Sequence, residues 1–264
     1  VSHWTPKDYN IEGSDFIIIK MGGSETSHPY NNPYTDSNFN YWVDKAWNTP
    51  NRNGGVGIPV IVYWMQNPRV YFENGISKEQ LYSFSEQDHI VFKEIIKAWH
   101  SGKAWKNILE FFFDFEEASL WGGGSDLWQW IYTDELKNRF IHKVNANEQP
   151  YPFPPIKIGM YSRLSFIKQH PAMMNWLRVN TDVSTWPANY PRRIPNSNPN
   201  ITADEVREMY LPLDHWVPYP LLDMALPDNK AREKSWDYWQ FSGEPDWNVF
   251  NGTPQELYSR LGFV

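Results

Sequence analysis

The segment Ile108-Leu-Glu-Phe-Phe-Phe-Asp-Phe115 is a near-continuous apolar run that is predicted to form a buried strand. A strand with one face in water would alternate apolar and polar residues, whereas a strand covered on both faces carries apolar residues throughout. Strands of the second kind are typical of parallel sheets with helices packed on them. The segment therefore predicts an α/β fold.

Short runs of the same kind recur on both sides of this segment, with helical patterns between them. Strands are predicted at residues 15–20, 58–64 and 156–161, and weaker candidates are found at 182–186 and 237–241. Helices are predicted at residues 36–48, 77–99, 126–145 and from Thr253 to about Gly262, with capping boxes at Ser77 and Thr253. This βαβα order predicts a parallel sheet, either open or closed into a barrel.

The overall composition excludes several classes of protein. The 264 residues suit one large domain or two small ones, and the absence of Cys excludes disulfides and thiolate chemistry. The net charge of −7 argues against nucleic-acid binding, which needs a basic surface. No run approaches 18 apolar residues, so no membrane span is predicted, and a signal peptide is expected to be absent or already removed.

Aromatic residues are unusually abundant, with fifteen each of Trp, Tyr and Phe. Most of them are expected to fill the core. So many Trp residues in a polar, acidic chain also indicate a surface that stacks on flat apolar faces, such as those of sugars, bases or proline-rich peptides. The negative charge disfavours bases among these ligands.

Asp114 and Glu116 are candidate catalytic carboxylates at the end of the central strand. Residues two apart in a strand point to the same face, with Cα atoms about 6.6 Å apart at about 3.3 Å per residue. Mutual repulsion and apolar surroundings raise the pKa of at least one member of such a pair, which keeps it protonated near neutral pH. Glycoside hydrolysis uses one such acid to protonate the leaving group and a second carboxylate to stabilise positive charge. Two solvated acids at a strand end are the other interpretation.

Other catalytic chemistry has no support in the sequence. His-Glu-x-x-His is absent and the seven His show no metal-ligand spacing, so no metal or cofactor is predicted. Gly-x-Ser-x-Gly and the dinucleotide and P-loop fingerprints are also absent. The glycine clusters at Gly22-Gly-Ser24 and Gly54-Gly-Val-Gly57 are expected to form tight turns.

Short motifs occur in order along the whole chain. They include Asp114-Phe-Glu116, of the form Asp-x-Glu, and Asp246-Trp-Asn-Val-Phe250, of the form Asp-x-Asn-x-Phe. Further motif segments are residues 1–4, 16–20, 36–39, 62–64, 159–162, 185–190 and 239–242. This ordered series resembles the motifs of glycoside hydrolase family 25, the Chalaropsis-type lysozymes.

The resemblance implies a single domain over residues 1–264, built as a modified β/α barrel with fewer than eight helices. It implies hydrolysis of the β-1,4 bond between N-acetylmuramic acid and N-acetylglucosamine in peptidoglycan, by a monomeric protein that acts on the cell wall as a secreted enzyme or a phage lysin. Glu116 would be the general acid, Asp114 would orient the substrate's 2-acetamido group, a candidate internal nucleophile, and Asp246 would be a further acid. The substrate-binding residues implied are Tyr63, Trp64, Tyr161, Trp186, Trp239 and Lys20. For the three Trp residues, a place in the core is the other interpretation.

Two departures from the family pattern leave alternatives open. The family has an Asp before its opening Val, whereas this sequence begins at Val1; without that Asp the chain could be a non-catalytic glycan-binding barrel, or an adhesion module of a phage or cell wall. Residues 187–235 hold eight prolines and are predicted to be a structured surface insertion. A chitinase-like enzyme is a further alternative, but it would require an Asp at the position of Phe112.

Overall fold

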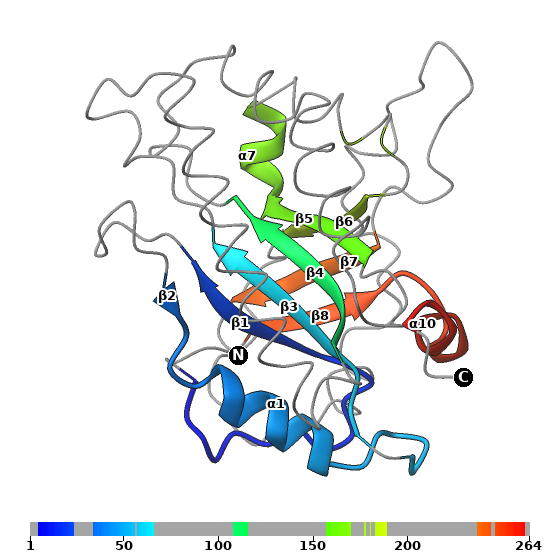
Figure 1. Ribbon diagram of the computed structural model, residues 1–264. Helices are drawn as coiled ribbons and strands as arrows, with labels where there is room; N and C mark the ends of the chain where they lie inside the picture. The colour runs from blue at the N-terminus through cyan, green and yellow to red at the C-terminus, as the bar shows by residue number, and fades with distance from the viewer. Residues whose placement is uncertain are drawn as a thin grey trace, which may run out of the picture.

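Eight strands form one curled sheet whose central members run parallel. The computed structural model describes residues 5–23, 34–55, 57–65, 108–115, 157–169, 177, 180, 183–188, 237–243 and 246–261. Within them the strand order is β2-β1-β3-β4-β5-β6-β7-β8; neighbours from β1 through β7 are parallel, and β2 and β8 are added antiparallel at the two ends. The predicted α/β fold, a modified barrel with parallel core strands, is confirmed (Figure 1).

The six predicted strands are all present, with ends that differ from the prediction by at most three residues. The strands are β1 (Ile17–Gly23), β2 (Tyr34–Thr35), β3 (Val60–Met65), β4 (Ile108–Asp114), β5 (Lys157–Arg163), β6 (Ser184–Ala188), β7 (Tyr238–Gly243) and β8 (Asp246–Phe250). The two antiparallel end strands, β2 and β8, were not predicted. Each is short, and neither carries the continuous apolar run that marks a strand buried on both faces.

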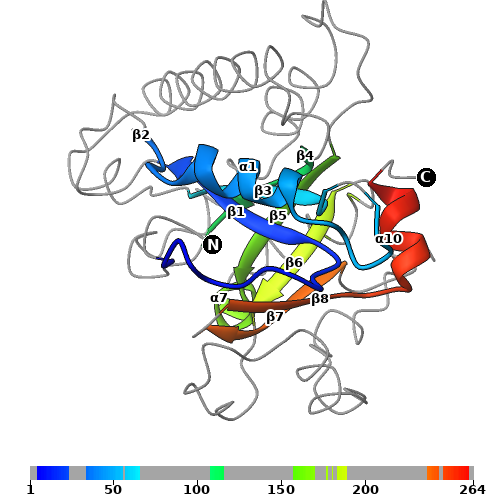
Figure 2. The same ribbon diagram turned by 90° about the horizontal axis from the view of Figure 1, so that it is seen from below.

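The sheet has an inner side that encloses an apolar cluster. Its buried members are Ile18, Ile61, Phe112, Tyr161, Trp186, Ala188, Tyr238, Leu257 and Leu261. Phe16, directly before β1, packs edge-on against Tyr238 of β7 with ring centroids 5.5 Å apart. The two ends of the strand order therefore approach each other, and Figure 2 shows β7 and β8 curled across from β1.

The helices in the described residues are α1 (Phe39–Asn48), α7 (Leu164–Gln169) and α10 (Pro254–Arg260). α1 begins three residues later than predicted, because Asp36 caps the preceding turn by accepting a hydrogen bond from the Asn38 backbone N–H at 2.9 Å. The predicted capping box of α10 is confirmed: the Thr253 hydroxyl accepts from the backbone N–H of Glu256, and the Glu256 carboxylate accepts from that of Thr253. None of these helices is long and apolar enough to span a membrane.

The turns predicted at the two glycine clusters have different outcomes. Gly54 and Gly57 have positive φ angles of 77° and 79°, as the predicted turn requires. The turn predicted at Gly22 is wrong, because Gly22 and Gly23 end β1. A Cβ on Gly22 would lie 2.0 Å from the carbonyl oxygen of Tyr34, so glycine is needed there for β2 to approach.

Several predictions lie outside the described residues. They are the helices at 77–99 and 126–145, the end of the last helix at Gly262, and the Pro-rich insertion beyond Ala188, where β6 ends.

Candidate active site

Asp114 stands in a row of residues at the carboxyl ends of the parallel strands. It is the last residue of β4, and its Cα is in register with Tyr161 of β5, which is in turn in register with Trp186 of β6. Residues at the same level of neighbouring strands point to the same side of a sheet. Tyr161 and Trp186 belong to the inner cluster, so the carboxylate of Asp114 also faces inward, where it is only 4% exposed.

Trp186 is the centre of an aromatic group beside this row. Its ring centroid lies 4.2 Å from that of Tyr161, 5.4 Å from that of Phe112 and 6.0 Å from that of Tyr63. Three of the four rings are buried, and Tyr63 is the half-buried one. The predicted binding residues Tyr63, Tyr161 and Trp186 are thus brought together on the inner side with Asp114.

Two amide side chains from the last hairpin hold this aromatic group. The Tyr161 hydroxyl donates to Gln240 Oε1 at 2.5 Å, and the Trp186 indole Nε1–H donates to Asn248 Oδ1 at 2.8 Å. Gln240 lies in β7 and is directly paired with Asn248 of β8. Both belong to segments that carry the family resemblance, but nothing in the local sequence distinguishes them from their neighbours.

Lys20 lies at the same end of the barrel. It follows Ile18 by two residues in β1, so the strand alternation places it on the inner side. Its ammonium nitrogen lies 3.9 Å from the Met65 sulfur and 5.7 Å from the centre of the Tyr34 ring. Met65 is in register with Asp114, so the Lys20 cation in β1 and the Asp114 carboxylate in β4 lie on the two strands that flank β3.

Trp64 and Trp239 are not brought to this side. Each adjoins a residue of the inner side, Tyr63 and Tyr238 respectively, so alternation turns both indoles to the outer face of the sheet. Both are buried, at 1% and 0% exposure. In these positions they fill the layer outside the barrel.

The structure describes less of the two other predicted acids, Asp246 and Glu116. The backbone of Asp246 begins β8, paired with Gly243 of β7, two residues before Asn248. Glu116 lies outside the described residues, which end at Phe115 in this part of the chain. No group of three His, Asp or Glu positioned to hold a metal ion is found in the described segments.

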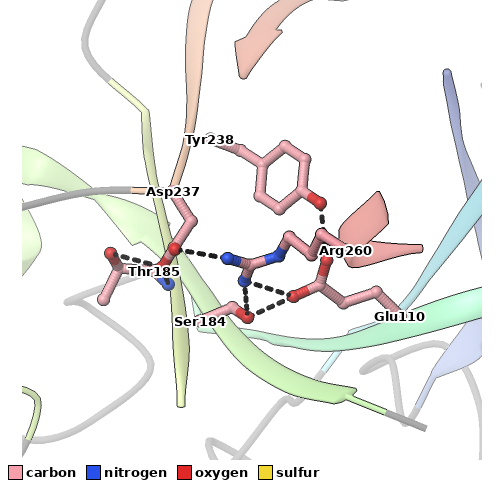
Figure 3. Close-up of polar contacts among 6 residues, drawn as sticks. All are labelled: Glu110, Ser184, Thr185, Asp237, Tyr238 and Arg260. Atoms are coloured by element: carbon pink, nitrogen blue, oxygen red, sulfur yellow. Dashed lines mark hydrogen bonds and ion pairs between the residues drawn. The ribbon is translucent and has the colours of Figure 1, made fainter. Parts of the chain in front are cut away.

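A second polar cluster lies at the opposite end of the barrel, where the strands begin (Figure 3). Glu110 of β4 is completely buried; it accepts hydrogen bonds from Ser184 and, at 2.5 Å, from Tyr238, and it is ion-paired with Arg260 of α10 at 3.0 Å. Arg260 also reaches Asp237 at 2.8 Å. We call Glu110, Ser184, Asp237, Tyr238 and Arg260 the basal network.

The electrostatics of the basal network are those of a buried ion pair in which each charge faces an opposite charge. Burial would lower the pKa of Arg260, but the negative charges of Glu110 and Asp237 outweigh it and raise that pKa above its ordinary value. Burial and the Glu110 carboxylate raise the pKa of Tyr238 well above its usual range. The amino ends of barrel strands serve stability rather than catalysis in enzymes of this architecture. A Glu within a buried apolar strand was the sequence signal for this network, since a buried carboxylate requires a partner.

A structural comparison with known proteins agrees with the fold, whereas the sequence comparisons find no match. No protein-family model matches the sequence, and no curated protein was found to be similar to it. The structure is similar to the crystal structure of the bacterial lysozyme from Streptomyces coelicolor, with a TM-score of 0.52 and 17% sequence identity. The match covers 100% of this chain and 95% of that one, and it shows a likeness of fold.

Proposed function

We propose that the chain is a lysozyme-type glycoside hydrolase that cleaves the β-1,4 bond between N-acetylmuramic acid and N-acetylglucosamine in peptidoglycan. The observation that carries the proposal is the placement of Asp114 at the carboxyl end of β4, in register with Tyr161 and Trp186 on the inner side. Catalytic residues of barrel enzymes lie at this end of the strands. The fold shared with a bacterial lysozyme and the motifs that resemble glycoside hydrolase family 25 support the same assignment.

Asp114 is proposed to act on the charge that develops at the anomeric carbon. A carboxylate that is largely shielded from water interacts more strongly with positive charge than a solvated one. In the proposed mechanism it orients the 2-acetamido group of the substrate and stabilises the oxocarbenium-like transition state. Glu116, two residues further on, is the proposed general acid, and Asp246 at the start of β8 is the proposed further acid.

The aromatic group is proposed to bind the sugar rings. Apolar faces of pyranose rings pack on aromatic side chains, and half-buried Tyr63 offers such a face, backed by Trp186. The net charge of −7 disfavours long-range attraction to an anionic wall, so binding is expected to depend on short-range contacts. We accordingly propose a single-domain, monomeric protein that acts on the cell wall outside the cytoplasm, as a secreted enzyme or a lysin.

A chitinase-like activity is disfavoured by Phe112. In that alternative an Asp would stand two residues before Asp114 on the same side of the strand. The Phe112 ring instead lies within the aromatic group, completely buried and 5.4 Å from Trp186.

The test is clearance of a bacterial wall suspension by the wild type and by Asp114→Asn, Glu116→Gln and the matched control Glu117→Gln. We expect the wild type and the Glu117 variant to clear walls, and the other two to lose at least about a hundredfold in rate, the lower end of what acid catalysis contributes. Wall binding without clearance by the wild type would identify a glycan-binding module instead. Cleavage of chitin oligomers without clearance of walls would identify the chitinase-like activity.

A further inference from the structure

The hairpin β7–β8 contributes a pair of amide side chains that have no role in the proposed catalytic mechanism. Gln240 and Asn248 are directly opposite each other in the antiparallel register. Tyr238 and Phe250, two residues away on the respective strands, belong to the inner cluster, so both amides face inward. Each amide oxygen accepts one hydrogen bond from one ring of the Tyr161–Trp186 pair.

We infer that Asn248, supported by Gln240, is a positioning residue for sugar binding, because it fixes the indole of Trp186 and thereby the half-buried ring of Tyr63. This inference rests on the proposed function, since it takes the ligand to be a β-1,4-linked N-acetylated glycan.

The hydrogen bond of Trp186 is specific to this site rather than a general consequence of burial. In the described part of the chain, the buried indole nitrogens of Trp42 and Trp64 have no hydrogen-bond partner. An indole has a single donor, and Trp186 uses it on Asn248 at 2.8 Å. Turning the indole over would break this bond, so Asn248 selects one orientation of the ring.

The bond also spans the barrel wall. Trp186 lies in β6 and Asn248 in β8, and β7 stands between them in the sheet. The contact therefore ties the aromatic group to the strand that begins with Asp246, two residues before Asn248. Asn248 thereby links the aromatic group to the strand that carries the proposed acid.

Trp186 has little surface of its own for a ligand, because it is only 4% exposed. Its contribution is to support Tyr63, which packs against it edge-to-face at 6.0 Å and is the half-buried ring of the group. Loss of the Asn248 bond should consequently weaken glycan binding more than it slows the bond-breaking step.

The experiment measures equilibrium binding of a soluble tetrasaccharide of alternating N-acetylglucosamine and N-acetylmuramic acid by calorimetry, and KM and kcat on the same substrate. Asn248→Leu removes the acceptor at similar volume, Asn248→Asp keeps an acceptor oxygen, and Trp186→Phe removes the donor. We expect Asn248→Leu to raise Kd and KM by about tenfold with kcat within about twofold, and Asn248→Asp to restore Kd to within about threefold of the wild type. In a Trp186→Phe background, Asn248→Leu should have no further effect, because interacting partners are not additive.

Unchanged Kd in Asn248→Leu, or an equal effect in both backgrounds, would overturn the inference. If Asn248→Leu fails to fold by near-ultraviolet circular dichroism, Trp186→Phe alone decides, since wild-type affinity in that variant is equally incompatible with the inference. Calorimetric binding is measured with Glu116→Gln added to every protein, so that the proposed hydrolysis does not consume the ligand, whereas KM and kcat are measured without it. A protein that binds the tetrasaccharide but does not hydrolyse it without Glu116→Gln would refute the proposed hydrolase while leaving this inference testable.

Discussion

Replacement of Arg260 by Met should destabilise the protein far more than loss of an ordinary surface charge. Arg260 is the only cation among the members of the basal network, and Glu110, its partner at 3.0 Å, is completely buried. Removal of one member of a buried ion pair leaves the other charge uncompensated, at a typical cost of about 3–5 kcal/mol. Ser184 and Tyr238 still donate to Glu110 in the variant, so we expect the lower end, about 3 kcal/mol.

The assay is urea unfolding followed by intrinsic Trp fluorescence. The matched control is Arg52→Met, whose arginine pairs with Asp15 at 4.0 Å and is 41% exposed; exposed pairs of this kind contribute about 0–1 kcal/mol. Adding Glu110→Gln to Arg260→Met removes the uncompensated charge and should recover at least about half of the lost stability. A loss below about 1 kcal/mol in Arg260→Met, or a further loss in the double variant, would show that the basal network does not act as a buried ion pair.

Three further predictions concern single positions. Gly159→Ala should lower stability by about 1–3 kcal/mol in thermal unfolding and weaken glycan binding, because the new Cβ would lie 2.2 Å from the Phe112 ring; wild-type values for both would contradict the packing. Because the pKa of Tyr238 is raised in the folded protein, the unfolded chain loses the phenol proton at a lower pH than the folded one. The free energy of unfolding of the wild type should therefore fall as pH rises above about 10, and that of Tyr238→Phe should fall less steeply. Equal dependence of the two free energies on pH would refute this prediction. Thr253→Ala should cost about 0.5–2 kcal/mol in chemical unfolding by removing the capping box of α10, whereas Thr253→Ser should cost less.

The parallel core was predictable because each buried strand carries its own apolar run. β8 escaped prediction because its sequence, with Asp246 and Asn248, reads as a polar segment until its pairing with β7 is known. Asn248 is paired with Trp186, 62 positions away, and the local sequence carries no information about such a partner.

The candidate site was predictable only where sequence spacing sets the side of the sheet. Asp114 follows Phe112 by two residues, so its inward direction follows from strand alternation. Trp64 adjoins Tyr63, so only one of the two could face the site, and the structure selects Tyr63. The roles of Gln240 and Asn248 could not be predicted from the sequence, because the hydrogen bonds that distinguish them connect to residues 79 and 62 positions away along the chain.

The link between Glu110 and Arg260 has a consequence for synthesis of the protein. The two residues are 150 positions apart, so the carboxylate emerges from the ribosome long before its counter-ion. At about 5–20 residues per second the delay is roughly 8–30 s. During that interval Glu110 lacks its guanidinium partner and, among the described residues, has only Lys157, its register neighbour on β5, as a nearby cation. Closing the barrel at that stage would bury the carboxylate without the ion pair that it forms in the native structure. We therefore expect closure of the barrel to be completed only after α10 is translated, which makes the docking of α10 a late step in folding.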